Sequence, residues 1–379
     1  MSLLGVRLTL LIGPTVAVPA PPPLIEALHE VEVTHRDDGQ SGFSISFNIG
    51  RAGPAALMDY ALAASPLLRP FNRVIVMVSF NAMPHVLMDG IISRQDLAQG
   101  TEPGTSTLTI KGEDVSVMMG QEVRNDEHPA QNEMLIAGKL ILRYAQYGLI
   151  PVVIPPMSFD VPLPIERIPV QQDTDLDYLR KLADVHGHVF YVTPGPAPFT
   201  NYAYWGPPIR FGLPQRAITV NMGPETNAKL DEAGKDGLGT ATVEGQVQDA
   251  QTGQTIPIRT FGSLRPPLAS MPSWLVDGQS VRKEKLRESG GNAVQAMAKA
   301  QGAMEATTDV VKVSGELDAG SYGGVLQARA LVGVRGAGFS YDGFYYVRRV
   351  THKIALGRYT QKFELAREGL GSTTPMVPV

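Results

Sequence analysis

Apolar and polar residues alternate most regularly near the end of the chain, in two segments joined by a tight turn. Every second residue from Tyr359 to Leu365 points to one side, and the residues between them point to the other. A period of two is typical of a half-buried antiparallel strand. The pattern predicts a hairpin made of residues 343–354 and 357–369, with Phe363 on its inward face.

Similar strand signals fill the first third of the chain. Turn residues separate them, and one connector, residues 14–23, is proline-rich enough to be extended. The apolar run at the N-terminus is shorter than that of a signal peptide and alternates like a strand. We therefore predict a first β-domain over residues 1–120, a barrel or a sandwich, whose clearest strands are residues 6–10, 43–49, 73–80 and 106–111.

Helical periodicity replaces this alternation in the middle of the chain. Residues 131–147 carry apolar side chains at helical spacing and stop at a glycine. A second helix follows a proline-rich stretch, and Thr174 and Asp177 at its start resemble a capping box. Gly187 ends this helix, and residues 189–192 begin a strand.

The rest of the chain returns to strands. Those at residues 217–258 and 310–366 should belong to one β-domain, because the last strands alone are too few to close a barrel. No strand or helix period follows Gly369. The predicted domains after the first are residues 121–216 (α+β insertion), residues 217–369 (second β-barrel, with an inserted loop and helix at 259–307) and residues 370–379 (flexible tail).

The inserted segment offers one helix and one charged run. The helix, residues 292–307, is rich in alanine and should bury Val294, Met297 and Met304 along one stripe. Before it, residues 282–287 carry both signs of charge. Such a run is either a solvated surface or a contact site for a neighbouring protein, and the sequence leaves both interpretations open.

Composition excludes several classes of protein. The 379 residues are 43% hydrophobic and 18% charged, as in a folded globular protein with more than one core. The net charge of −4 gives no reason to expect nucleic-acid binding. No apolar run approaches the ~18 residues of a transmembrane helix. The absence of cysteine excludes disulfides and thiolate chemistry.

Few residues suggest a chemical site. Asp184, His186 and His188 are close enough in sequence for a metal site, although Gly187 breaks the helix between the imidazoles. The alternative is a helix C-terminus, where the macrodipole favours a histidine. His352 lies in a strand and is predicted to be packed or interfacial rather than a base. Sequence motifs of a nucleophile elbow, a zinc helix and a phosphate loop are absent.

Acidic and aromatic residues give equally weak signals. Asp173, Asp175 and Asp177 could act as catalytic carboxylates, but the start of a helix also favours acidic residues. Trp205 and Trp274 lie near prolines and are predicted to be loop anchors, with ligand stacking as the alternative. The sequence therefore predicts no catalytic, cofactor-binding or metal-binding residue.

Three segments, in order, resemble those of the phage late control D family. They are residues 112–119 with the helix that ends near Leu149, the capped helix and strand of residues 170–192, and the closing hairpin of residues 343–369. Together the segments span residues 107–369, and their order and spacing carry the resemblance.

This family forms the baseplate hubs of contractile phage tails and of related contractile injection systems. The resemblance implies a β-rich α+β fold with two tube-like antiparallel β-barrels and a smaller α+β insertion. It also implies a homotrimer that adapts a hexameric tail tube on one face to a trimeric spike on the other, and that contacts other baseplate proteins. No enzymatic step, cofactor, nucleic-acid specificity or membrane insertion is implied. The protein would assemble in the cytoplasm and join a virion or an injection-system particle.

Several alternatives remain open at this stage. Only about ten residues follow Gly369, so the spike is expected to be a separate protein. The sequence does not distinguish a phage hub from the hub of an injection system. Two other classes are a tail-associated enzyme that degrades the cell wall and a carbohydrate-binding module.

Overall fold

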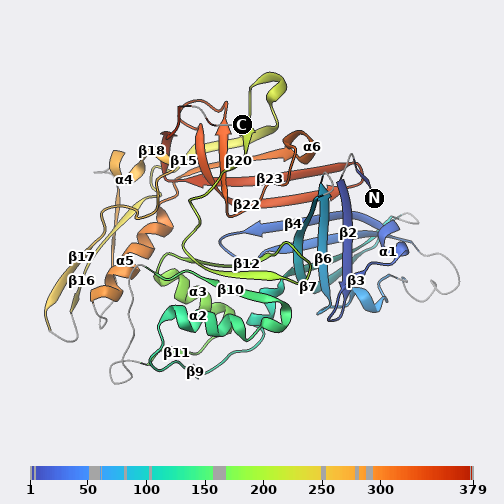
Figure 1. Cartoon of the computed structure of the whole chain (residues 1–379), viewed down its shortest axis with the longest axis horizontal. Helices are drawn as coiled ribbons and strands as arrows, with labels where there is room; N and C mark the ends of the chain where they lie inside the picture. The colour runs from blue at the N-terminus through green and yellow to red at the C-terminus, as the bar shows by residue number, and fades with distance from the viewer. Residues whose placement is uncertain are drawn as a thin grey trace.

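A single 14-stranded sheet runs through the molecule in this computed structural model (Figure 1). Its main path is open at both edges over the described residues, so the pairing closes neither of the two expected barrels. From edge to edge the strands are β1 (Ser2–Leu3), β2 (Val6–Gly13), β6 (Arg73–Phe80), β7 (Met83–Ala98), β8 (Ser106–Asp114), β5 (Gly42–Ile49), β4 (Leu28–Arg36), β22 (Gly343–Ala355), β23 (Arg358–Arg367), β20 (Val311–Asp318) and β15 (Ala228–Lys235).

Three further strands lie off this path. β3 (Val18–Pro19) pairs with β2, and β14 (Gln215–Thr219) runs parallel to β21 (Leu331–Arg335), which pairs with β22. All other pairs in the sheet are antiparallel over the part of the chain that is placed. The structure describes residues 2–3, 6–50, 60, 62–80, 83–101, 105–156, 168–248, 253–277, 281–286, 293–375 and 377.

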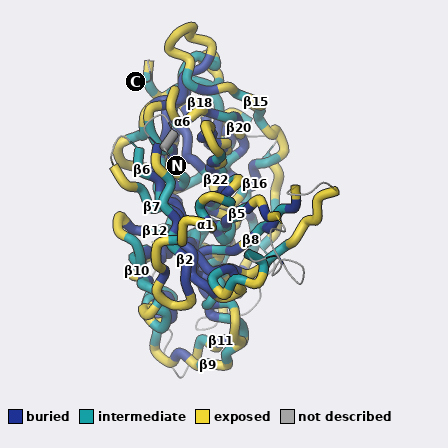
Figure 2. Tube along the Cα trace, turned by 90° about the vertical axis from the view of Figure 1, so that its right-hand side faces the viewer, coloured by how far each residue is buried: buried dark blue, intermediate teal, exposed yellow. Residues whose placement is uncertain are grey.

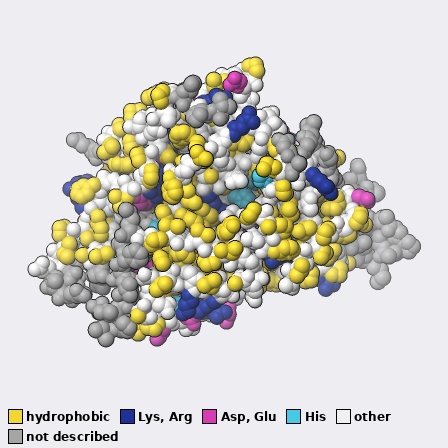
Figure 3. All heavy atoms as spheres, in the orientation of Figure 1, with side chains coloured by type: hydrophobic (Ala, Val, Ile, Leu, Met, Phe, Trp, Pro, Cys, Tyr) yellow, Lys and Arg dark blue, Asp and Glu magenta, His cyan; other side chains and the backbone are white. Residues whose placement is uncertain are grey.

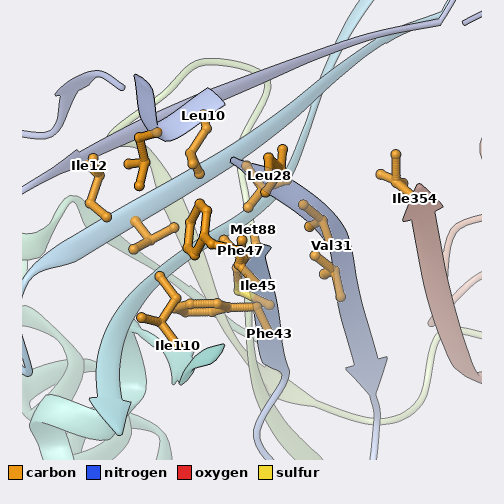
Figure 4. Close-up of a cluster of buried hydrophobic side chains, with 14 of the residues drawn as sticks. Leu10, Ile12, Leu28, Val31, Phe43, Ile45, Phe47, Met88, Ile110 and Ile354 are labelled. Carbon is orange, nitrogen blue, oxygen red and sulfur yellow. The ribbon is translucent and has the colours of Figure 1, made fainter. Parts of the chain in front are cut away.

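The long sheet consists of two halves joined at one place. β4 of the first half pairs with the second part of β22, so residues 30–36 oppose residues 349–355. Each half covers its own apolar core. Ile354 and Tyr359 of the second half pack in the core of the first half, which Figure 4 shows in part. We call this place the joint; both backbone pairing and apolar contacts hold it.

The closing hairpin is confirmed. β22 and β23 pair around a turn at Leu356 and Gly357, where the glycine has a φ of +80°. Phe363 is 2% exposed and lies in the second core, while Lys362 and Glu364 are exposed. The alternation in the sequence therefore assigned the two faces of β23 correctly.

A smaller α+β unit packs beside the first half of the sheet. The predicted cap is confirmed, because Thr174 accepts a hydrogen bond from the N–H of Asp177 and donates one to its carboxylate. Gly187 has a φ of +61° where the chain turns from helix to strand. The elements are α2 (Glu133–Leu142), α3 (Asp175–Val185), the sheet β10 (Leu149–Val153), β13 (Asn201–Gly206) and β12 (Val189–Pro194), and the pair β9 (Asp126–Glu127) and β11 (Val170–Gln171).

A lateral unit corrects the prediction for residues 241–259. These residues form β16 (Ala241–Gln248) and β17 (Thr255–Arg259), which join β19 (Arg282–Lys285) in a separate sheet rather than the second half of the long sheet. The reason is that Val243, Val247 and Ile258 pack against α5 (Ala293–Thr307). In Figure 1 this unit forms one end of the molecule.

The buried stripe of α5 also differs from the prediction. Met304 is buried as expected, but Val294 and Met297 are exposed, and Ala296 and Ala300 take their place. Small residues are needed on this side of α5, because a Cβ at Gly302 would lie 2.7 Å from the backbone nitrogen of Gly187. The close approach of the two backbones therefore decides which stripe is buried.

The predicted tail begins with ordered structure. β24 (Gly369–Ser372) pairs with β18 (Ala269–Pro272), and Val377 is buried. Buried segments run through the middle of the molecule and exposed ones lie along its margins (Figure 2). Within the described residues, the remaining helices are α1 (Pro22–Glu26), α4 (Ser273–Val276), α6 (Ala319–Tyr322) and the short 3-10 turns Pro66–Leu68, Val115–Gly120, Ala145–Tyr147 and Gly223–Glu225.

Candidate functional site: a polar sheet face and its arginine junctions

One face of the long sheet is polar from β7 to β15. Along these strands most inward residues are apolar and buried, and most outward residues are hydroxylic or charged and partly exposed. The strand registers place the outward residues in continuous rows. This polar face consists of Arg94, Asp96, Thr107, Thr109, Lys111, Ser44, Ser46, Glu30, Glu32, Thr34, Arg349, Thr351, Lys353, Lys362, Glu364, Lys312, Ser314, Glu316, Lys229 and Glu232.

Several charges on the polar face form ion pairs across neighbouring strands, such as Lys111 with Asp96 and Arg349 with Glu364. Lys353 Nζ lies 3.2 Å from Glu30 Oε1, so this ion pair bridges the joint. The hydroxyl oxygens of Thr34 and Thr351 bridge it as well, at 3.0 Å. Seven residues of the polar face are cationic and six are anionic, so its net charge is small. The face is therefore hydrated and nearly neutral across both halves of the sheet.

A groove of about 580 Å³ opens in the polar face beside the joint. Its lining includes Asp37, Lys312 and Glu364. Arg348 also lines the groove, and its Nε lies 3.4 Å from Asp37 Oδ1. Burial raises the pKa of Asp37, and Arg348 opposes this shift. Val310, Val313 and Leu365 add apolar side chains to this charged lining.

Arg329 forms the first of three buried arginine junctions. Its guanidinium donates to the backbone oxygen of Arg36 at 2.6 and 3.0 Å, to Ser41 Oγ at 2.7 Å and to the backbone oxygen of Val192 at 3.1 Å. It also stacks 3.9 Å from the ring centroid of Tyr191. The side chain thus connects the second half of the sheet to the first half and to the α+β unit. Its backbone φ of +65° is strained for a non-glycine residue.

Arg73 forms the second junction. It makes two 2.7 Å hydrogen bonds to the carboxylate of Asp89, and both side chains are almost fully buried. The α+β unit contributes the backbone oxygen of Tyr147, 2.9 Å from Arg73 Nη2, and Asn201 Nδ2, 3.0 Å from Asp89 Oδ2. A bidentate pair of this kind fixes orientation as well as distance. The first half of the sheet and the α+β unit are therefore held together by hydrogen bonds of this buried ion pair.

Arg210 forms the third junction, near the lateral unit. It pairs with Asp309 and lies 3.2 Å from Glu368 Oε2. Burial alone would lower the pKa of Arg210, but the two carboxylates outweigh it and raise the pKa. Glu368 also accepts hydrogen bonds from the backbone N–H groups of Leu268 and Ala269. Sequence reasoning missed all three junctions, because each arginine meets partners from distant parts of the chain.

The histidine pair of the sequence analysis is an aromatic cluster. The rings of His186 and His188 are 5.7 Å apart, and both pack edge-on against Trp205. Burial lowers the pKa of His186 and lowers that of His188 to about 3, so both are neutral at pH 7. Over the described residues, Asp184 does not join them, or any other side chains, in a group of three suited to a metal ion.

The three aspartates at the start of α3 are in structural contacts. Asp175 is fully enclosed, and Arg143 Nη1 lies 3.2 Å from its Oδ1. Asp173 pairs with Lys181 at 2.6 Å, and Asp177 belongs to the helix cap. The sequence analysis offered two interpretations of these aspartates, as catalytic carboxylates or as acidic residues favoured at the start of a helix. The contacts agree with the second interpretation.

The remaining predicted residues have mixed outcomes. His352 is packed as expected, with Nδ1 3.0 Å from the hydroxyl of Tyr359. Trp205 is not a loop anchor, because it lies inside β13 with its indole N–H donating to the backbone of Leu179. Trp274 lies in the short helix α4, half-buried against the lateral unit. The charged run begins with β19, whose Arg282 and Lys283 side chains are exposed.

Apolar side chains also reach the surface in quantity. Figure 3 shows a broad apolar area on the face of the molecule seen in Figure 1. Large exposed apolar patches mark contacts with other macromolecules in soluble proteins. Among the placed helices none is long and apolar enough to cross a membrane. Over the whole described surface, on whichever face they lie, the large apolar side chains that are more than 60% accessible include Phe211, Leu213, Leu238, Phe261, Leu264, Leu275 and Phe339.

Comparison with solved structures identifies the fold. A tail protein from Neisseria meningitidis MC58 superposes with a TM-score of 0.63 over 97% of this chain and 98% of its own, at 12% identity. The 43 kDa tail protein of prophage MuSo2 from Shewanella oneidensis gives 0.60 over 95% and 98%, at 10% identity. The fold is that of phage tail proteins.

A secretion-system protein has the same fold. The E. coli c3393 protein, a type VI secretion component described as similar to the T4 tail proteins gp27 and gp5, gives a TM-score of 0.53 over 93% of this chain and 77% of its own, at 12% identity. No protein-family model matches the sequence. A search of curated proteins also finds no match. The similarity to these proteins is therefore one of fold, at 10–12% sequence identity.

Proposed function

We propose that this protein is the structural hub of a contractile phage tail or of a contractile injection-system baseplate, of the late control D type. Three chains would form a ring that connects a hexameric tail tube to a trimeric spike carried by a separate protein. The observation that carries the proposal is the polar face, which is continuous across both halves of a sheet with the fold of tail proteins. The ring would assemble in the cytoplasm and become part of the virion or injection particle.

The polar face suits the wall of a water-filled channel. Hydroxyl groups and a near balance of positive and negative charges offer little apolar surface on which a passing macromolecule would bind, and little net field to retain it. The opposite face carries the two apolar cores and supplies stiffness. We therefore propose that the polar face points toward the axis of the ring.

Symmetry supports the same arrangement. Each chain contributes two half-sheets, so three chains contribute six, which matches a sixfold tube through pseudo-sixfold symmetry. The edge strands β1 and β15 have an unpaired side over the described residues, and such edges favour pairing with another chain. The barrels implied by the family resemblance would then close only between subunits.

Light scattering on the purified protein tests assembly first. A hub ring should give three times the 40.8 kDa mass of the chain, because obligate interfaces bury roughly 2,000–5,000 Å² or more. A monomer at every accessible concentration, both alone and with the spike protein, would contradict the proposal.

Single-cysteine labelling tests the direction of the polar face, because the chain has no cysteine of its own. Thr351→Cys lies on the polar face, and Leu238→Cys, at an 82% exposed position outside it, is the control. In the assembled ring a small maleimide should label both, while a maleimide on a large polymer should label only Leu238→Cys. Equal labelling of both by the large reagent in the trimer would place the polar face outside the ring.

The C-terminal segment supports an orientation for the ring. The family resemblance relates this end of the chain to the spike side, so we propose that the segment after β24 lies at the spike-binding face. A bulky protein fused after Val379 should block spike binding and leave the trimer and its tube contacts intact. Loss of tube binding with the spike still bound would reverse the orientation.

The proposed role is mechanical and includes no chemical step. The acidic residues that suggested catalysis, Asp173, Asp175 and Asp177, have structural partners. Purified protein should therefore leave peptidoglycan intact in a zymogram, and lysis would favour the cell-wall-degrading alternative. Binding of a glycan by the isolated chain would favour a carbohydrate-binding module instead.

A further inference from the structure

Two histidines occupy inward positions at the joint, where the alternation calls for apolar residues. His35 on β4 lies opposite Val350, and His352 on β22 lies opposite Val33. Their rings are 5.7 Å apart in an edge-to-face arrangement. They are 8% and 1% exposed, and the valines opposite them, Val350 and Val33, are fully buried. Two valines would fill these positions at no electrostatic cost, so the choice of histidine calls for an explanation.

The groups around the two rings are neutral or cationic. His35, His352, His85 of β7 and the buried Arg329 line one cavity of about 430 Å³, and none of its lining residues is a carboxylate. From β23, the hydroxyl of Tyr359 contacts His352. From β7, the backbone of Leu87 forms a hydrogen bond with His35.

Carboxylates act on this cavity only from outside. Asp37 and Asp114 interact with the charge of Arg329, but neither of them lines the cavity. A proton on either histidine would therefore add a second positive charge beside Arg329 without a counter-ion in contact.

We propose that the joint is an acid-sensitive latch. Protonation of His35 and His352 would separate β4 from β22 and release the two halves of the sheet from each other. The proposal goes beyond the hub function and stands on the chain itself, so it can fail without affecting that function. In a hub, acid would loosen the ring at one defined line in each subunit.

The sign of the effect follows from burial. Desolvation lowers the pKa of His35 well below its usual value of 6.5 and lowers that of His352 to about 3, so the closed joint contains neutral rings. When the joint opens, each pKa returns to about 6.5. The closed state is therefore fully stable above pH 6.5 and loses stability as the pH falls below it. By linkage, the equilibrium constant for opening should rise roughly 30-fold per histidine between pH 8 and pH 5.

Hydrogen exchange of the full chain, corrected for intrinsic rates, tests the latch. Protection of β4 and β22 should fall more than about tenfold from pH 8 to pH 5, relative to β2 and β6, which contain no histidine. The double variant His35→Gln/His352→Gln should remove this fall. His29→Gln, at an exposed histidine of the same strand, should retain it. Equal protection at both pH values, or a fall that persists in the double variant, would overturn the proposal.

A covalent lock keeps the test decisive if the double variant does not fold. Thr34 and Thr351 face each other across the joint with hydroxyl oxygens 3.0 Å apart, so Thr34→Cys/Thr351→Cys can form a disulfide there. The oxidised protein should keep its protection at pH 5, and the reduced protein should lose it. Equal loss in both forms would show that acid acts somewhere other than the joint.

Discussion

The two halves of the long sheet share a packing device that their sequences do not reveal. In the first half, Phe43 of β5 lies opposite Gly112 of β8; in the second, Phe363 of β23 lies opposite Gly315 of β20. A Cβ at Gly112 would lie 2.4 Å from the Phe43 ring, and one at Gly315 would lie 2.7 Å from the Phe363 ring. In each half the aromatic ring covers a strand glycine and so fills the space that its missing side chain leaves.

The halves differ in how the chain reaches this arrangement. In the first half, hairpins join neighbouring strands such as β4 with β5 and β6 with β7. In the second half, β15 and β20 pair although residues 236–310, with the whole lateral unit, lie between them. The comparison teaches that the packing of a half-sheet depends on a few paired positions and not on the path of the chain between them.

Replacing either of the two phenylalanines with a charged residue should have the largest effect on stability. Phe363→Asp and Phe43→Asp each place a carboxylate in a closed apolar core, and each should destabilise the protein by more than about 4 kcal/mol. Chemical unfolding measures the loss. Lys362→Asp, one residue away on the polar face, is the matched control and should cost less than about 1 kcal/mol. Full thermal stability of Phe363→Asp would mean that its side chain does not face the core.

Local patterns in the sequence predicted local structure well. The closing hairpin and the capped helix α3 depend on residues that are neighbours in the chain, so alternation and capping rules were sufficient. The joint depends on the pairing of residues 30–36 with 349–355, about 320 positions apart, which no local rule specifies. For the same reason, residues 241–259 had a correct strand pattern but were assigned to the wrong sheet.

For the polar face, the sequence predicted the outward residues of single strands but not the continuous surface that they form. The outward residues of each strand were visible in the alternation, but their union into one polar face required the strand registers. The arginine junctions left no local signal, since Arg329 meets an acceptor 293 residues away at Arg36. Val294 and Met297 were misplaced because hydrophobicity was weighed without the close backbone contact at Gly302, which favours alanine on that side of α5.

Loss of the Arg73–Asp89 ion pair, the second junction, should have the next largest effect on stability. This junction belongs to the first half of the sheet only. Asp89→Asn leaves Arg73 buried without its charge partner, which should cost about 3–5 kcal/mol. Glu364→Gln removes an exposed carboxylate that pairs with Arg349 in the second half and should cost at most about 1 kcal/mol. Unfolding in denaturant compares the two variants. Equal losses would mean that water reaches the Arg73 junction.

The glycines opposite the phenylalanines should give intermediate and similar effects. In Gly112→Ala the new methyl would lie 2.2 Å from the backbone oxygen of Ile91, and in Gly315→Ala it would lie 2.3 Å from that of Lys229. Neither backbone atom can move cheaply, so each variant should lose about 1–3 kcal/mol. The two losses should add in the double variant, because the sites lie in different cores. A loss in only one half would show that the packing device is not equivalent in the two.

The smallest effects should come from ion pairs on the polar face, and they sharpen the comparison between the joint and the halves. A double-mutant cycle on Glu30 and Lys353, with Gln and Met as replacements, measures a pair that bridges the joint; a cycle on Glu364 and Arg349 measures a pair inside the second half. Both pairs are partly exposed, so each coupling should be about 0.2–1 kcal/mol and should weaken with added salt.

Equal couplings at pH 8 are expected because the closed joint is as rigid as the rest of the sheet. If the latch opens, only the Glu30–Lys353 coupling should vanish at pH 5, where most of both carboxylate populations are still ionised. Loss of both couplings together at that pH would point to general acid unfolding instead of a local opening of the joint.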